Sequence, residues 1–513
     1  MCVEAHSVFD LVRILAQANS IKRIRSSGRA FKHVLIYFVA RASNGDYGNQ
    51  GMQSNSKLLS FFSAALLLLT VPQIFQAQVP APSPGSAEPS PTQRQTPPNP
   101  PTTAPTVQPV QTLNNGDSTG IYGIQGVLIE TVDGKTVSSQ AVDQGFNPAS
   151  SIKLATALVA LETFGPQHRF ATGFWTDGSF DKSTGQILGN LYVTGRDPSF
   201  HYEHAVMVAR QLNVLGIRTV TGDLVIASGF TMNFGASARR SGEVLLDTLD
   251  ASLRSSEAIR TWTYERSTKQ DFASLQAVPS VNVMGDIQIG SVPLAARLLL
   301  THNSSKLTDV LKVLLCYSNN FMAERIGDSL GGTQAVRRRL IDRLAIPPEE
   351  LQLASLSGLG SNRVTPRAMM RIFRELRKGL QKNKLSPADI MPVAGIDPGT
   401  LEDRFTGPAW QGSVIAKTGT LVRTDGGASS LVGQMRTANG EVLLFVIMNQ
   451  RGNVVRFREN QDYMVMQVQN SRGGPKAFKY NPLALTMKLA DTESVSGSAS
   501  AESEPNLKST SSP

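Results

Sequence analysis

The chain has few of the residues that form disulfides or bind metal ions. Among its 513 residues are two cysteines, Cys2 and Cys316, and six histidines, and no Cys/His cluster has the spacing of metal ligands. Cys316 ends an apolar run, where a thiol is predicted to be buried and inert. We therefore expect no disulfide framework, no metal centre and no cofactor.

A long apolar stretch that would cross a membrane comfortably is also missing. The run at residues 58–71 has 14 residues, whereas a membrane-spanning helix needs about 20. The run follows Lys57, and its length suits the apolar core of a signal peptide. With a start at Met52 and cleavage after Ala77, residues 1–77 become an N-terminal extension and signal peptide. The sequence thus predicts an exported protein of the periplasm or cell envelope, held at a membrane at most through an uncleaved signal segment.

Outside residues 1–77, charge of one sign is not concentrated in any part of the chain. The net charge is +10, of which residues 1–77 contribute +5 through eight Lys/Arg and three Asp/Glu. The other 42 basic and 37 acidic residues are spread without a long basic run. Nucleic-acid binding would gather basic residues on one face, so we do not expect it.

Composition also marks the limits of the folded part. Residues 78–119 are rich in Pro, Thr, Gln and Ser, and this composition cannot bury a core and predicts an extended linker. Residues 473–513 are predicted to form a C-terminal segment that is disordered in its Ser/Glu-rich part, from residue 491. The folded part is therefore expected between residues 120 and 490.

Two predicted β-hairpins lie at the two ends of this folded part. Asp133-Gly134 separates strand-like runs near its start, and Asn439-Gly440 separates strand-like runs near its end. Both dipeptides favour two-residue hairpin turns, because both central positions need a positive φ. Helical spacing of apolar residues indicates helices at 152–163, 306–330, 366–378 and 458–468. We expect an α/β protein of the α+β type, with an antiparallel sheet and a helical block.

More strand-like segments lie between the two hairpins, for example at 189–194 and 222–227. We expect residues 169–290 to form a smaller inserted domain. Residues 120–168 and 291–472 then make up the main domain, which is discontinuous in sequence.

Three short motifs follow one another along the main domain. They are S-x-x-K at Ser150–Lys153, S-x-N at Ser318–Asn320 and K-T-G at Lys417–Gly419. This type of set is associated with β-lactamases and penicillin-binding proteins. Each motif alone is weak, since S-x-x-K also occurs at 54–57 and 179–182, and S-x-N at 280–282. Among the S-x-x-K copies, however, only the one at Ser150 opens an apolar helical run.

The residues of these motifs suit nucleophilic catalysis by a serine. A serine hydroxyl needs a nearby base to take its proton, and a spacing of three along a helix brings Lys153 onto the face of Ser150. A lysine among polar donors and other cations can lose its proton near neutral pH. Ser150 would stand at the start of the 152–163 helix, where free N–H groups favour negative charge. Lys417, on an edge strand, could hold a substrate carboxylate, and Gly419 would let a substrate backbone come close.

Around these motifs the chain resembles the D-alanyl-D-alanine carboxypeptidase/endopeptidases, the class C group of low-molecular-mass penicillin-binding proteins. The resemblance runs from about residue 120 to 470, with a weak patch at 230–290. The stretches that carry it are Phe146–Leu154, Ser318–Glu324, Pro392–Leu401, Lys417–Leu421, Gly195–Phe200 and Gly216–Val225.

The resemblance implies a serine β-lactamase/penicillin-binding transpeptidase-like fold. It also implies a serine peptidase that acts on peptidoglycan stem peptides, with β-lactams as covalent inhibitors. The resemblance implies that Ser150 is acylated by the penultimate D-alanine, that Lys153 is its base, and that Ser318 and Asn320 relay protons and hold the peptide. It also implies that Lys417 and Thr418 bind the terminal carboxylate and that the N–H groups of Ser150 and Thr420 form the oxyanion hole. Asp197 is implied to face the donor side chain.

The chain departs from the family pattern in two places. Ser355-Leu-Ser-Gly-Leu359 stands where the family often has Asp-Gly-Ser-Gly-Leu, so any role of this segment is open. The gap from Ser150 to Ser318 is 168 residues (318 minus 150), shorter than in the large members. We infer a second domain, with any further inserted domain reduced or absent.

Two other functions stay open at this point. A serine β-lactamase shares the acyl-serine step. The E-x-x-x-N stretch of class A enzymes is missing between 320 and 417, while the Y-x-N of class C enzymes fits at Tyr317, one residue out of frame. A non-catalytic wall-binding or β-lactam-sensing protein could keep the same fold. The sequence also does not distinguish a preference for carboxypeptidase activity from a preference for endopeptidase activity.

Overall fold

The computed structural model describes residues 123–235, 237–268, 278–482, 485 and 493–495. The predicted extension and signal peptide at 1–77 and the linker at 78–119 lie outside these residues. Within the described part, no helix is both long and apolar enough to span a membrane.

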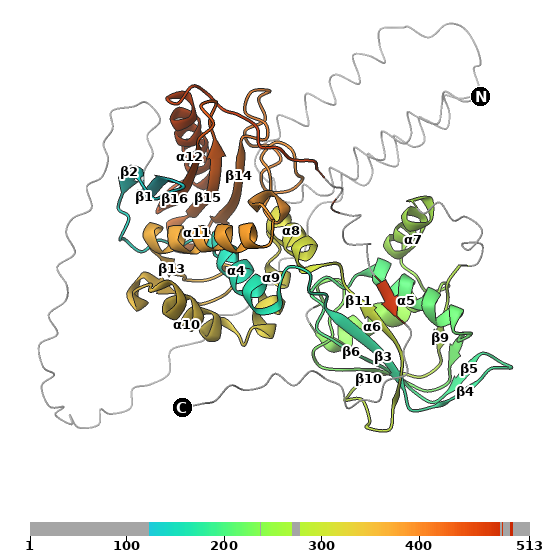
Figure 1. Ribbon diagram of the computed structural model, residues 1–513. Coiled ribbons are helices and arrows are strands. Elements are labelled where there is room, and N and C mark those ends of the chain that lie inside the picture. Colours follow the sequence, from blue (N-terminus) through green and yellow to red (C-terminus); the bar gives the residue numbers. More distant parts are fainter. Residues whose placement is uncertain (1–122, 236, 269–277, 483–484, 486–492, 496–513) are drawn as a thin grey trace, which may run out of the picture. The chain divides into compact units, whose positions relative to one another are not determined.

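A five-stranded antiparallel sheet joins the two ends of the main domain (Figure 1). The antiparallel pairing of the flanking strands confirms both predicted hairpins. The predicted two-residue turns are wrong, because Thr131 N donates to Lys135 O and Thr437 N donates to Glu441 O, which leaves loops at 132–134 and 438–440. Only the glycines, with φ values of 100° and 86°, have a positive φ there, as in a three-residue loop whose last position is left-handed. The strands, in spatial order, are β14 (Val414–Leu421), β15 (Ala428–Arg436), β16 (Val442–Gln450), β1 (Ile124–Thr131) and β2 (Thr136–Gln140).

Strand β14, which carries the K-T-G motif, lies at the edge of this sheet. Part of its outer edge is covered by the preceding loop. Ala394 N donates to Val414 O (2.9 Å), and Ala416 N donates to Pro392 O (3.2 Å). Because backbone groups alternate in direction along a strand, those of Thr418 and Thr420 face the same outer edge, beyond the covered part.

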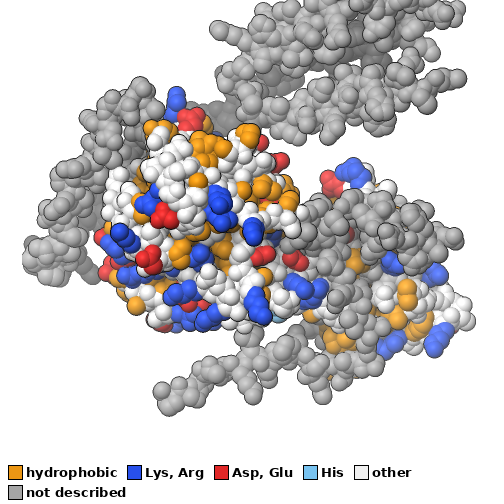
Figure 2. Space-filling model, turned by 45° about the horizontal axis from the view of Figure 1, so that its top comes forward, with side chains coloured by type: hydrophobic (Ala, Val, Ile, Leu, Met, Phe, Trp, Pro, Cys, Tyr) orange, Lys and Arg blue, Asp and Glu red, His pale blue; other side chains and the backbone are white. Residues whose placement is uncertain are grey.

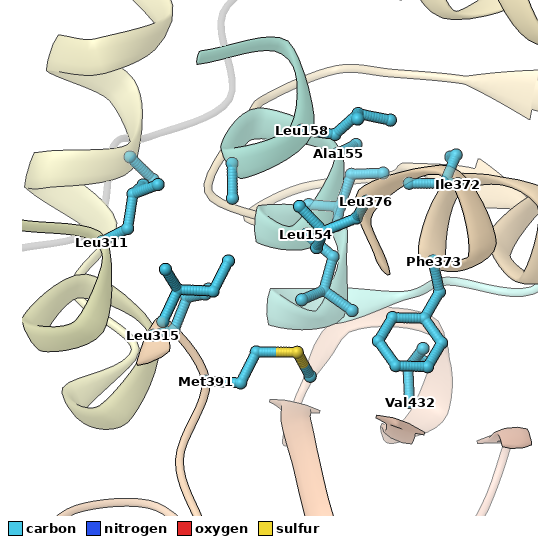
Figure 3. Packing of buried hydrophobic residues seen from close by; sticks show 14 of the residues in the cluster. Leu154, Ala155, Leu158, Leu311, Leu315, Ile372, Phe373, Leu376, Met391 and Val432 are labelled. Atoms are coloured by element: carbon cyan, nitrogen blue, oxygen red, sulfur yellow. The ribbon is translucent and has the colours of Figure 1, made fainter. Parts of the chain in front are cut away.

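Helices cover both faces of the sheet, which explains why its central strands are apolar on both sides. Leu444 and Val446 of β16 belong to one buried cluster, whereas Phe445 and Ile447 belong to another. The first cluster includes residues of α4 (Lys153–Phe164) and α11 (Pro366–Lys382), and the second includes Val465 of α12 (Val454–Asn470). Figure 3 shows Leu154 of α4 and Phe373 of α11 packed in the same cluster as Val432 of β15.

The structure corrects the predicted helix at 306–330. It consists of α8 (Leu307–Tyr317) and α9 (Asn320–Ser329), separated by Ser318 in a left-handed conformation with φ 56°. The Asn319 side chain caps α9 by accepting from Met322 N (3.0 Å), and Asn is a favoured residue at this position. The apolar spacing runs through both helices, so it hides the break. A further helix, α10 (Thr333–Leu344), was not predicted.

The inserted segment forms a sheet of six strands and a sheet of four. β11 continues the larger sheet past residue 290, where the sequence placed the end of the inserted domain. In addition, residues 493–495, predicted to be disordered, form a short strand, β17, on β11; that part of the prediction was wrong. The strands of the larger sheet are, in spatial order, β10 (Ile287–Ile289), β8 (Leu224–Ile226), β6 (Leu191–Gly195), β3 (Ala171–Thr176), β11 (Arg297–Asn303) and β17 (Glu493–Val495). Those of the smaller sheet are β4 (Ser179–Asp181), β5 (Gln186–Leu188), β7 (Thr219–Val220) and β9 (Asn282–Val283). The helices of this segment are α5 (Tyr202–Val214), α6 (Ala238–Leu249) and α7 (Ser256–Thr268).

On the face seen in Figure 2, Lys and Arg side chains are spread among acidic, polar and apolar ones. The predicted even distribution of charge fits this view.

Candidate active site

Ser150 lies in a short 3-10 helix, Ala149–Ile152, that leads into α4. The Asn147 side chain fixes this entry. It accepts from Ala149 N (3.0 Å) and donates to Gly360 O (3.0 Å) and to Asp425 (2.7 Å). The predicted placement of the serine at the start of this helix is thus confirmed, and its hydroxyl is held where N–H groups at a helix start favour negative charge.

Lys153 lies beneath the serine with its amine in contact with three oxygen atoms. Its Nζ is 2.8 Å from Ser150 Oγ and 2.7 Å from Asn320 Oδ1, and it also donates to the Ser357 carbonyl. The last two oxygens can only accept. A neutral amine has two N–H bonds and one lone pair, so these two acceptors leave the lone pair for the Ser150 hydroxyl.

The surroundings of Lys153 favour this neutral form. The side chain is fully buried, and burial penalises the ammonium and lowers its pKa to about 7, while the charge of Glu324 acts in the opposite direction. Near neutral pH a large fraction of the amine is therefore free to accept a proton.

The segment Ser355–Leu359, whose role the sequence left open, contacts the reacting groups through its backbone. The Ser357 carbonyl accepts from Lys153 and lies 3.3 Å from Ser150 Oγ. Ser357 N donates to Glu324 (2.8 Å), and Ser355 Oγ accepts from Gly358 N (3.1 Å). A side chain at Gly358 would run into the Ala149 carbonyl, and its φ is 90°. The serine at 355 thus stabilises the turn that presents this carbonyl.

The charge of Glu324 raises the pKa of Lys153, and this leads to a prediction on how acylation depends on pH. Glu324→Gln keeps an oxygen that can accept from Ser357 N but removes the negative charge that raises the pKa of Lys153. In the predicted role of Lys153 as the base of Ser150 the free amine is the active form, so the rising limb of the pH–acylation profile is expected to move to lower pH. Stopped-flow acylation by a chromogenic β-lactam between pH 5 and 9 would measure it. A move to higher pH contradicts the argument.

The second motif is divided between two positions by the break at Ser318. Ser318 ends α8 and lines the cavity above Ser150, whereas Asn320 begins α9 and contacts Lys153. The structure therefore brings both residues close to Ser150. This arrangement fits the motif Ser318–Asn320, which the sequence favoured over a motif that begins at Tyr317. In the competing Tyr317 frame the asparagine would be Asn319, which instead caps α9.

The third motif lies on β14, beside the turn that carries Ser150. Thr418 and Thr420 line the cavity. Gly419 allows this approach, since a Cβ there would meet Pro148 O, Ala149 Cβ and Ser430 Oγ. The sequence assigned the glycine to a close substrate backbone; in the structure its close neighbours include the turn that carries Ser150.

Lys417 does not line the cavity. Its side chain is fully buried, and its Nζ donates to the Thr418 carbonyl (2.8 Å). Burial, and then the charge of Lys153, hold the pKa of Lys417 well below its usual range. Its predicted contact with a substrate carboxylate stays a prediction, and the arrangement gives it an internal hydrogen bond instead.

Asp197 also lies apart from the residues that line this cavity. It is 2% exposed in the inserted domain and accepts from Ser199 N (2.8 Å) and Ser199 Oγ (2.6 Å). Burial raises the pKa of its carboxyl. Its predicted contact with a donor side chain stays a prediction; the bonds that the structure gives it are local.

The cavity in front of Ser150 has a volume of about 440 Å³ and is bounded by five parts of the main domain: the turn of Ser150, the break at Ser318, the loop before β14, β14 itself and α12. α12 supplies charged residues that sequence reasoning missed, because nothing in a helical pattern tells which turn faces a site. Within the described residues, no three His, Cys, Asp or Glu side chains are arranged to hold a metal ion. The lining residues outside the three motifs are Gly399, Thr400, Asp403 and Arg404 of the loop before β14, and Val455, Arg458, Glu459 and Asp462 of α12.

Comparison with known proteins agrees with this geometry. The model of the D-Ala-D-Ala carboxypeptidase 3 (S13) family matches residues 121–236 and 250–470. A D-alanyl-D-alanine carboxypeptidase from Actinomadura sp. (strain R39) is 25% identical over 422 residues, covering 63% of this chain and 77% of the relative. A carboxypeptidase from Mycobacterium tuberculosis is 27% identical over 363 residues, covering 64% and 77%. Among solved structures, a predatory peptidoglycan endopeptidase from Bdellovibrio bacteriovorus has a TM-score of 0.59 at 23% identity, covering 71% of this chain and 96% of that one.

Proposed function

Because the chain belongs to the D-Ala-D-Ala carboxypeptidase 3 (S13) family, we propose that it is an exported serine peptidase of the penicillin-binding type. It cleaves the D-alanyl-D-alanine ends or the cross-links of peptidoglycan stem peptides through an acyl-Ser150 intermediate. The observation that carries this proposal is the 2.8 Å contact between Lys153 Nζ and Ser150 Oγ, in a buried setting that lowers the pKa of the amine to about 7.

The reaction begins with proton transfer from Ser150 Oγ to Lys153 as Oγ attacks the carbonyl carbon of the penultimate D-alanine. The developing oxyanion is held by the N–H groups of Ser150 and Thr420. The outward direction of the Thr420 backbone, on the open part of the edge of β14, supports this role. The C–N bond then breaks, and the proton passes from Lys153 to the leaving amine, directly or through Ser318. Water, activated by the same amine, later hydrolyses the ester.

A β-lactam would acylate the same serine, because its strained amide places a carbonyl where the peptide carbonyl lies. The ring opens, but the leaving nitrogen stays attached to the acyl group and blocks the approach of water. A penicillin G-acylated form of a Bdellovibrio bacteriovorus endopeptidase has been solved, and its fold matches this chain with a TM-score of 0.58. This supports the penicillin-binding part of the proposal.

Export and an envelope location follow from the substrate, since peptidoglycan lies outside the cytoplasmic membrane. The apolar run at 58–71 and the start at Met52 support the same location, as the expected signal peptide. A single cut after Ala77, found by N-terminal sequencing of the secreted protein, is the expected result.

Labelling with a fluorescent penicillin tests the nucleophile. The purified protein is expected to take up one label, and Ser150→Ala to take up none. Ser179→Ala is a matched control, because Ser179 begins another S-x-x-K motif but lies on an exposed strand of the inserted domain; it is expected to label normally. Unchanged labelling of Ser150→Ala would overturn the assignment.

The substrate is tested with a pentapeptide that ends in D-alanyl-D-alanine and with a cross-linked stem-peptide dimer. Release of D-alanine indicates carboxypeptidase activity, and cleavage of the dimer indicates endopeptidase activity; at least one is expected. Loss of the penicillin label within seconds would instead favour a β-lactamase. Stable labelling with neither cleavage would favour a β-lactam sensor.

A further inference from the structure

We propose that Arg458 of α12 binds the terminal carboxylate of the substrate, on the leaving-group side of the scissile bond. The site is then selective for substrates in which this carboxylate is free. This inference rests on the proposed peptidase function. The geometry behind it is the position of Arg458 in the wall of the cavity that contains Ser150, with its Nη2 donating to Thr420 Oγ1 at 2.8 Å.

A cation would stabilise this carboxylate, and the lysine of the K-T-G motif is not among the residues that line the cavity. In the substrate, the terminal carboxylate lies two bonds from the nitrogen of the scissile amide. Lys417 is fully buried and donates to a backbone carbonyl of its own strand. Of the K-T-G motif and the residue after it, only Thr418 and Thr420 line the cavity, and threonine carries no charge.

Arg458 has donors left for a ligand. A guanidinium has five N–H groups arranged as a planar fork that matches a carboxylate, and the hydroxyl of Thr420 accepts from one of its nitrogens. Arg458 forms no ion pair with any residue that the structure describes. Three other charges of the cavity wall are already paired: Arg404 with Asp462, and Glu459 with Arg456 at 3.1 Å.

Arg458 is also close enough to the reacting atoms. Thr420 links the two sites, because its backbone N–H is expected at the oxyanion and its hydroxyl contacts the guanidinium. A carboxylate two bonds beyond the scissile nitrogen therefore lies near Thr418, Thr420 and Arg458 when the carbonyl lies at Ser150. The open cavity continues along α12 past this point, as Val455 and Asp462 in its wall indicate.

One further charge lies in the cavity wall. Asp403, in the loop before β14, has no ion-pair partner among the described residues and would repel an anionic ligand. The carboxylate is therefore expected on the side of α12 and away from Asp403. Removal of the Asp403 charge is therefore expected to change kcat/KM in the opposite direction from removal of the Arg458 charge.

The experiment compares two peptides that differ in one group. Diacetyl-L-lysyl-D-alanyl-D-alanine carries the carboxylate, and its C-terminal amide does not. For Arg458→Gln, kcat/KM on the acid is expected to fall about 10- to 100-fold, as for loss of a charge-assisted bond, while kcat/KM on the amide changes less than about threefold. Arg458→Lys is expected to recover part of the preference for the acid. Asp403→Asn is expected to raise kcat/KM on the acid.

Controls separate binding from a structural role. Arg423→Gln removes the same charge three residues after Thr420, and Arg423 is exposed and does not line the cavity, so it is expected to match the wild type on both peptides. If Arg458→Gln loses the acid and the amide equally, Arg458 only positions Thr420 and the inference is wrong. If the wild type cleaves neither peptide and takes up no penicillin, the proposed function itself fails.

Discussion

Lys153→Met is expected to slow acylation of Ser150 by penicillin roughly 10²- to 10⁴-fold, the usual contribution of a positioned general base. Methionine fills a similar volume but can neither accept the serine proton nor donate to Asn320 and the Ser357 carbonyl. Stopped-flow measurement of the acylation rate checks this. An uptake rate within a few-fold of the wild type would show that another group takes the proton.

The wild-type pH profile gives the same prediction a second readout. Since burial lowers the pKa of Lys153 to about 7, the free amine increases about tenfold per pH unit below that value and levels off above it. The acylation rate is expected to follow this curve. In Lys153→Arg the guanidinium keeps its proton throughout, so the rate should stay low at every pH. A wild-type rate that falls as the pH rises through 7 contradicts the assignment of Lys153 as base.

Asp397→Leu is expected to lower the free energy of unfolding by about 3–5 kcal/mol, as when one partner of a buried ion pair is removed. Asp397 is fully buried and accepts from Lys312 Nζ (2.6 Å), Tyr480 Oη (2.6 Å) and Val393 N (2.8 Å). Burial, and then the bond to Asp397, raise the pKa of Tyr480. The substitution leaves an ammonium buried without its anion. Urea unfolding followed by circular dichroism measures the loss.

The double variant Lys312→Met/Asp397→Leu provides the control. It removes both charges together, so it is expected to lose less stability than the sum of the two single variants. Arg367→Gln, whose partner Asp143 is 62% exposed, should change stability by at most about 1 kcal/mol. Additive losses in the double variant would mean that the two charges do not depend on each other.

The sequence predicts the hairpins, the helices at 152–163, 366–378 and 458–468, and the edge strand of Lys417 because each has a local cause. A positive φ in an Asp-Gly turn, or an apolar stripe along a helix, is encoded by neighbouring residues. The meeting of Ser150, Lys153, Ser318 and Asn320 could be predicted from motif order and family resemblance. None of these features depends on fine packing.

What the sequence missed depends on contacts between distant segments. The break at Ser318 interrupts an apolar pattern that continues on both sides of it. The role of the Ser357 carbonyl is a backbone role, so the missing aspartate in its segment gave no sign of it. Burial of Lys417 depends on how closely Gly419 lets β14 approach the turn at Pro148. The distance between these two segments cannot be inferred from residue types alone.

The partly covered edge of β14 also decides the shape of peptide that the site accepts. The loop at 392–394 already pairs with the first half of this edge, so only the half at Thr418–Thr420 can pair with another chain. A substrate would therefore add itself to the sheet as a very short extra strand. It must be extended across the scissile bond, and it cannot extend past the loop in one direction. An N-methyl group on the amide that faces this edge would remove a donor from the pairing, and such a peptide should be a poor substrate even with all its side chains intact.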